Sequence, residues 1–166
     1  MIRELLNAAS SAAPKDNSDR GPLASSKYFE TTSALHISAY QGHKECIEIL
    51  LEFGADVDQK DAQGRTAMHC AAAGGQPESL QFLLSKGATV ELAMDNSGMT
   101  PMAFAASYGH FDCVLLLHTY DADVTGLLRN GMNCLHMACA GGSARVTQYL
   151  VEKCASNPNV QDRFLT

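Results

Sequence analysis

Apolar and polar positions recur in a fixed order along most of this 166-residue chain. A short run of small and apolar residues reads S-A-L-H-I-S-A, T-A-M-H-C-A-A, T-P-M-A-F-A-A and N-C-L-H-M-A-C in four places, and their starts lie 33, 34 and 33 residues apart. A more strongly apolar run follows each one, such as C-I-E-I-L-L-E-F-G, with leucines at helical spacing. Four copies at one period predict a repeat architecture.

Each copy predicts two short helices joined by a turn. The first residues of the copies are good helix N-caps, because a side-chain oxygen can accept a free amide proton of the first turn; they are Ser33, Thr66, Thr100 and Asn133. Glycines that suit a left-handed helix end follow the first helices, at Gly42, Gly75, Gly109 and Gly142. One such helix pair cannot bury its own apolar face, but stacked copies bury each other's.

These residues resemble the ankyrin repeat, whose signature is T-P-L-H-x-A-A-x-x-G-H followed by a leucine pair and G-A-D. The resemblance covers about residues 28–162. It implies an all-α fold, a solenoid of stacked helix pairs with projecting β-turn fingers. It also implies a concave face built from the finger tips and the first helix of each pair.

The period divides the chain into repeats and partial repeats. Near the start, I-R-E-L-L-N-A-A resembles a second helix, but its leucine pair lies 45 residues before the next one instead of 33. The expected organisation is the second helix of a partial N-terminal repeat at 1–10, a loop insertion at 11–27, ankyrin repeats at 28–60, 61–94, 95–127 and 128–161, and the start of a further finger at 162–166. The sequence therefore reads as a fragment of a longer array or multidomain protein.

Three departures from the signature affect the expected structure. Ala103 replaces the signature histidine of the third repeat. Asp121 and Cys154 replace the glycine that ends the second helix, so we expect the last two helix ends to be irregular. His118 replaces a leucine and could either enter the core or point outward.

Charge and composition narrow the classes of partner. The formal net charge of −6 argues against nucleic acid, which is bound by clustered Lys and Arg. No apolar run is long enough to cross a bilayer, so we expect no direct membrane contact in this segment. The six cysteines have irregular spacings and no C-x-x-C motif, which favours reduced thiols in a cytoplasmic, possibly nuclear, protein.

Neighbouring cysteines and histidines raise the question of chemistry. His69 and Cys70 point about 100° apart on a helix, which disfavours a catalytic dyad. The resemblance instead implies that His69 and its counterparts tie a helix start to the neighbouring loop. Cys134, His136 and Cys139 form the strongest metal candidate, but a structural zinc site needs four ligands, and buried cysteines at repeat positions are the simpler interpretation. We therefore expect no enzyme activity, no cofactor and no metal.

The remaining interpretation is a non-catalytic protein–protein interaction module, a scaffold or adaptor that binds a partner protein or peptide on the concave face. The resemblance carries over to first-helix positions Tyr40, Gln41, Ala73, Gly74, Ser107 and Tyr108, and to finger positions Phe29, Glu30, Thr32, Gln63, Arg65, Asn96, Ser97, Met99, Arg129, Asn130 and Met132. Within this row, Tyr40 and Tyr108 flank a patch with little side chain, and Phe29, Met99 and Met132 add apolar tips. The alternative is that the tyrosines only cover backbone.

Two further possibilities stay open at this stage. Leu127 and Leu128 interrupt the fourth finger, and packing on the adjacent finger is favoured over binding. The array could also be a regulatory or assembly domain of a larger ion channel or signalling enzyme, with an intramolecular partner in that longer chain.

Overall fold

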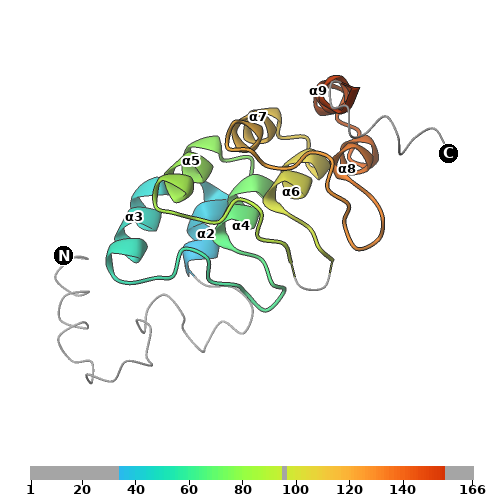
Figure 1. Ribbon diagram of the computed structural model, residues 1–166. Coiled ribbons are helices and arrows are strands. Elements are labelled where there is room, and N and C mark those ends of the chain that lie inside the picture. Colours follow the sequence, from blue (N-terminus) through green and yellow to red (C-terminus); the bar gives the residue numbers. More distant parts are fainter. Residues whose placement is uncertain (1–33, 95–96, 156–166) are drawn as a thin grey trace.

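The structure, a computed structural model, describes residues 34–94 and 97–155 of the chain, and the helices of this part stack in consecutive pairs (Figure 1). The pairs are α2 (Ala34–Gln41) with α3 (Lys44–Glu52), α4 (Ala67–Ala73) with α5 (Pro77–Ser85), α6 (Pro101–Ser107) with α7 (Phe111–Thr119), and α8 (Cys134–Ala140) with α9 (Ala144–Ala155). All regular elements in this part of the chain are helices. The predicted all-α solenoid is confirmed, whereas the assignments for 1–10, 11–27 and 162–166 lie outside the described residues.

The helices form two layers. The first helices α2, α4, α6 and α8 contact one another in order along one layer, and the second helices α3, α5, α7 and α9 do the same along the other. Long loops project from the stack between successive pairs (Figure 1). This arrangement buries the apolar stripe of each pair between the layers and against its neighbours.

Two of the predicted N-caps have the expected hydrogen bond. The side-chain oxygen of Thr100 accepts from the amide of Ala103 at 3.3 Å, and that of Asn133 accepts from the amide of His136 at 3.1 Å. Thr66 also precedes its helix in an extended conformation. Ser33 lies outside the described residues.

The expectation of two irregular helix ends was wrong at Asp121. This residue has a φ of 62°, close to the left-handed value of Gly87 in the previous repeat. The next residue, Ala122, donates its amide to Leu117 at 3.0 Å, just as Ala88 donates to Leu83 at 3.1 Å. Aspartate tolerates this conformation well enough for the same helix end to form.

The last second helix differs in length instead. It has 12 residues, compared with 9 in each of α3, α5 and α7, and it runs through position 154 to Ala155. Position 154 has neither the glycine of the first two repeats nor the aspartate of the third, and the helix continues where the other three end.

Adjacent first helices approach closely where the second of them has a glycine. A Cβ added to Gly74 would overlap the carbonyl oxygen of Tyr40, and one added to Gly141 would overlap that of Ser107. Neither glycine has a positive φ, so the conformation itself would accept any residue. The requirement for glycine therefore comes from helix packing.

This contact can be tested by a substitution that helix propensity alone would favour. Alanine is about 1 kcal/mol better than glycine in a helix interior, yet we expect Gly74→Ala to lower the free energy of unfolding by about 1–3 kcal/mol because α2 and α4 must separate. Chemical denaturation measures the change. Gln41→Ala, at the equivalent exposed position of α2, is the control and should stay within about 0.5 kcal/mol of the unmodified protein. A stabilised Gly74→Ala variant would contradict the packing argument.

Candidate protein-interaction surface

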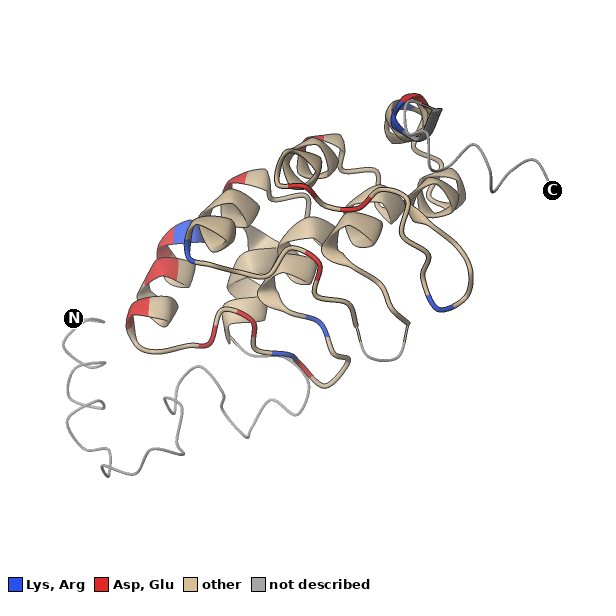
Figure 2. Ribbon diagram, in the orientation of Figure 1, with Lys and Arg blue, Asp and Glu red and all other residues tan. Residues whose placement is uncertain are grey.

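The exposed side of the first helices forms a surface that we call the inner face, and the projecting loops lie along its edge. None of α2, α4, α6 and α8 contains a Lys, Arg, Asp or Glu, and these helices are uniformly tan in Figure 2. The charged residues lie on the second helices and in the loops; α3 alone carries Lys44, Glu45, Glu48 and Glu52. A surface without charge can be dehydrated on contact at little electrostatic cost.

Exposed apolar side chains gather at both ends of a stretch of small residues on this face. On α2, Ile37 and Tyr40 are 49% and 50% exposed, and on α6 Tyr108 is 61% exposed at the helix end. Ala73 and Gly74 lie between them on α4. These exposed side chains make the inner face a candidate contact surface.

Tyr108 is held by neighbouring rings. Its ring stacks on Phe104 with centroids 6.4 Å apart and on His110 with centroids 6.3 Å apart. Phe104 in turn meets the ring of His69 edge-on at 5.7 Å. A ring supported in this way loses little rotamer freedom when it binds, which favours its use as an anchor.

The small residues between the tyrosines have structural reasons to be small. Gly74 lies against the backbone of Tyr40, and a Cβ on Gly75 would come within 2.6 Å of the His110 ring. His110 itself bonds through Nε2 to the carbonyl oxygen of Ala73 at 3.0 Å. The patch predicted from the sequence is therefore a place where backbones and one ring meet closely.

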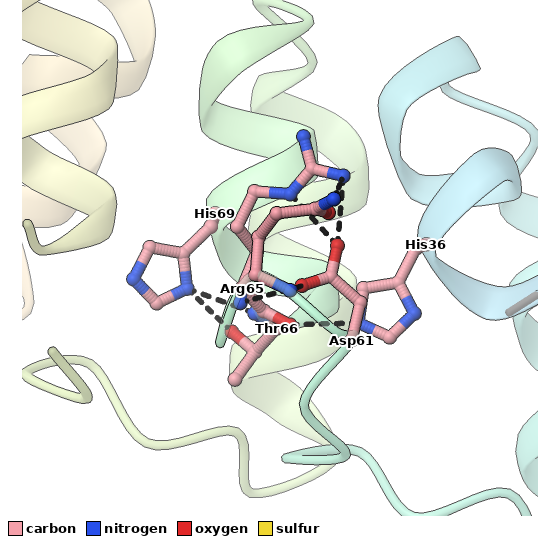
Figure 3. A network of polar contacts seen from close by, with 6 residues as sticks. His36, Asp61, Arg65, Thr66 and His69 are labelled. Carbon is pink, nitrogen blue, oxygen red and sulfur yellow. Dashed lines mark hydrogen bonds and ion pairs between the residues drawn. The ribbon is translucent and has the colours of Figure 1, made fainter. Parts of the chain in front are cut away.

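The finger of the second repeat is closed by a buried carboxylate (Figure 3). Asp61 Oδ1 accepts from the backbone amides of Gln63 at 2.9 Å and Arg65 at 2.8 Å. Asp61 Oδ2 accepts from Arg65 Nε at 2.8 Å and pairs with Nη2 at 2.7 Å. The Asp61 side chain is fully buried, so Arg65 supports the finger in addition to presenting a partly exposed guanidinium.

Signature histidines tie successive repeats together at the bases of the fingers (Figure 3). Nε2 of His36 bonds to the carbonyl oxygen of Arg65 at 2.9 Å, and Nε2 of His69 bonds to that of Met99 at 3.0 Å. Because a carbonyl can only accept, Nε2 carries the proton in both rings. The role implied by the resemblance is confirmed for these two histidines.

His69 is held in the neutral form. Its Nδ1 accepts from the backbone amide of Thr66 at 3.0 Å, so a proton on this nitrogen would oppose the bond. Burial lowers the pKa of His69 from 6.5 to about 4, and Lys60 and His36 add to the lowering, whereas the Met99 bond and Asp61 oppose it. Burial likewise lowers the pKa of His36.

The neighbouring thiol is equally unsuited to chemistry. Burial raises the pKa of Cys70 to about 11, while the pKa of His69 falls to about 4. A thiolate–imidazolium pair needs both shifts in the opposite direction. His69 is moreover fully engaged with Thr66 and Met99.

The residues of the metal candidate have separate surroundings. Cys134 is buried, His136 Nδ1 lies 2.7 Å from Asn133 Oδ1, and Cys139 Sγ lies 4.0 Å from the hydroxyl of Thr147. Within residues 34–94 and 97–155, no three His, Cys, Asp or Glu side chains gather as metal ligands. In the same part of the chain, no helix is long and apolar enough to cross a membrane.

The predicted finger residues divide into exposed and packed ones. Gln63, Arg129 and Asn130 are exposed, whereas Ser97, Met99 and Met132 are half-buried. Both methionines pack against the core, so their description as apolar tips was wrong. The finger residues Phe29, Glu30, Thr32 and Asn96 lie outside the described residues.

The two leucines of the fourth finger behave differently from each other. Leu128 is buried, as expected for packing, but Leu127 is 60% exposed. His118 is half-buried, and its Nδ1 lies 2.6 Å from the hydroxyl of Tyr149 on α9. It joins two second helices and does not point into solvent.

Sequence reasoning missed two residues of the inner face, Ile37 and Phe104. Ile37 lies three residues before Tyr40, and Phe104 four residues before Tyr108, so each pair shares a helix face. The helical spacing was a usable signal for both residues.

The geometry defines the chain as a helical repeat protein that presents an uncharged face. A family model described as ankyrin repeats in three copies matches residues 1–94 and 91–162. The chain therefore belongs to the ankyrin-repeat family. Ankyrin repeats generally act as non-catalytic modules that bind other proteins.

The chain is similar to parts of much longer proteins. It is 33% identical over 131 residues to Rabankyrin-5 of Mus musculus, covering 77% of this chain and 11% of that protein. It is 38% identical over 117 residues to Ankyrin repeat and SOCS box protein 16 of Mus musculus, covering 68% and 26%. It is also 32% identical over 129 residues to Neurogenic locus notch homolog protein 2 of Homo sapiens, covering 78% and 5%. The chain thus spans at most about a quarter of these relatives.

The inter-repeat histidine has a measurable effect on stability. We expect His69→Ala to lower the free energy of unfolding by about 2 kcal/mol, because the buried amide of Thr66 loses its acceptor and the Met99 carbonyl loses a donor. Urea denaturation provides the measurement. His43→Ala removes an exposed histidine and should change stability by less than about 0.5 kcal/mol. An equal decrease in the free energy of unfolding of the two variants would contradict a stabilising role for the His69 hydrogen bonds.

The lowered pKa of His69 also predicts a pH dependence. Between pH 6.5 and about 4, the unfolded chain binds a proton at this residue and the folded chain does not. The contribution of His69 to the free energy of unfolding is therefore fully present above pH 6.5 and is lost as the pH falls toward 4. The contribution of His69 is at most about 3 kcal/mol. Denaturation curves between pH 7 and 4 should therefore converge for the unmodified protein and His69→Ala, while His43→Ala keeps the original slope. Parallel curves for the unmodified protein and His69→Ala would contradict the shift.

Proposed function

We propose that the inner face binds an extended segment or surface of a partner protein, and that the chain acts as a scaffold or adaptor module. The observation that carries this proposal is the combination of four uncharged first helices with exposed Ile37, Tyr40 and Tyr108. Such a surface can bury aromatic anchors without leaving an ionised group unpaired.

The geometry also indicates how a partner would lie. Tyr40 stands on α2 and Tyr108 at the end of α6, with the small residues of α4 between them. An apolar side chain of the partner placed over Ala73 and Gly74 could contact both tyrosines. The exposed Gln63 and Arg129 in the fingers are positioned to supply polar contacts at the edge.

A second function remains a candidate because the relatives are much longer than this chain. The region matched by this chain covers 11%, 26% and 5% of the length of the three relatives described above. In a long protein of this kind the inner face could bind another segment of its own chain, so the array would serve assembly or regulation, for instance in an ion channel or signalling enzyme. The two functions can be separated by comparing how much partner protein is captured by the isolated array and by the full-length protein. A segment of the same chain would compete for the inner face only in the full-length protein.

Location in the cell is also a proposal. Among the described cysteines, Cys46, Cys70, Cys113 and Cys139 are free thiols. Free thiols suit the reducing cytoplasm or nucleus, which is where we place the module.

The tyrosines provide the direct test. With a protein captured by the array and then purified, the double substitution Tyr40→Ala and Tyr108→Ala should weaken the dissociation constant at least about tenfold, as expected for loss of central aromatic anchors. Isothermal titration calorimetry measures this constant, and thermal denaturation checks that the fold is intact.

The matched control is Tyr120→Ala. Tyr120 is also an exposed tyrosine, at 43%, but it ends α7 in the second-helix layer. Its substitution should change the dissociation constant by less than about twofold. If the double variant binds as tightly as the unmodified protein, the inner face is not the binding surface.

A further inference from the structure

The first described helix pair has an apolar side that is covered in every later pair. In α3, Cys46 is exposed and Leu50 is only half-buried. The residues at the same repeat positions in the three later second helices are all buried: Ser79, Cys113 and Val146 for the first position, and Leu83, Leu117 and Leu150 for the second.

The same difference extends to the first helix and to the turn after α3. Ala34 is exposed, whereas its counterparts Ala67, Pro101 and Cys134 are buried. Ala55 is half-buried, whereas its counterparts Ala88 and Ala122 are buried. We call the surface formed by Ala34, Cys46, Leu50 and Ala55 the leading side of the array.

The last pair shows which neighbour normally covers these positions. No helix follows α9 in the described part of the chain, yet Val146 and Leu150 are fully buried there. The second helices contact one another in order, α3 with α5, α5 with α7 and α7 with α9. The cover is therefore the second helix of the preceding pair, and the leading side is the place where such a helix is missing from residues 34–94 and 97–155.

The chain itself carries a segment suited to this place. Residues 2–9, I-R-E-L-L-N-A-A, contain a leucine pair like Leu50 and Leu51 of α3. The match to the ankyrin-repeat family begins at residue 1 and so includes this segment. Residues 10–33 connect it to α2, and 24 residues can span up to about 80 Å when extended. The connecting segment is therefore long enough for residues 2–9 to reach the leading side.

We propose that residues 2–9 dock on the leading side and that their leucine pair, Leu5 and Leu6, covers Cys46 and Leu50.

Cys46 serves as a reporter for this contact in the full 166-residue chain. Alkylation with a small thiol reagent, followed by peptide mass analysis, gives the rates at Cys46 and at Cys139, which is also exposed in the described stack. With residues 2–9 docked, Cys46 should react at least about tenfold more slowly than Cys139. The double substitution Leu5→Ser and Leu6→Ser should bring the two rates together.

Two controls accompany the measurement. Leu127→Ser replaces a leucine exposed on the fourth finger and should leave the Cys46 rate unchanged. Buried Cys113 should stay unreactive in every variant, which shows that the stack is folded. If Cys113 becomes reactive in the double variant, hydrogen exchange of the unmodified chain decides instead: the amides of residues 2–9 should be protected.

Four results would overturn the proposal. The first is a Cys46 that reacts as fast as Cys139 in the unmodified chain. The second is a slow Cys46 whose rate does not respond to the Leu5 and Leu6 substitutions. The third is a set of unprotected amides in residues 2–9. The fourth is protection of Cys46 that fades on dilution of the protein, because a second copy of the chain would then be the cover.

Discussion

Burial of each helix pair by its neighbour is the constraint on which this structure depends. A pair of helices with 7 to 9 residues each has too little surface to enclose an apolar core of its own. Stacking solves this, because Leu83, Leu117 and Leu150 are each buried against the preceding pair. The histidine bonds to the bases of the fingers help to hold these pairs in register.

The histidine ties show how register is maintained beyond apolar packing. A carbonyl at the base of one finger accepts from the ring of the preceding repeat, as Arg65 does from His36 and Met99 from His69. Such bonds have a preferred direction and distance, whereas packing of small side chains permits sliding. In the third repeat Ala103 has no ring to offer, and the backbone bond from Arg129 to Ser97 at 3.3 Å connects those two fingers instead.

Much of this organisation could be predicted from the sequence, because a repeat multiplies every local signal by four. The helices, the caps at Thr100 and Asn133 and the role of His69 were all foreseeable from spacing and from the family resemblance. The errors arose where one residue type can adopt two conformations or two side-chain placements. Asp121 can adopt the conformation of a glycine, and a methionine in a finger can turn back toward the core, as Met99 and Met132 do. Only the packing around each residue decides between such solutions.

The close contact at Gly74 limits how the inner face can vary. Any side chain there, or at Gly141, would push adjacent first helices apart. The positions of Ile37, Tyr40 and Tyr108 are free of this restriction, since their side chains already extend into solvent. At this repeat position, new side chains for binding, whether reached by natural divergence or in a combinatorial library, are thus confined to alternate repeats.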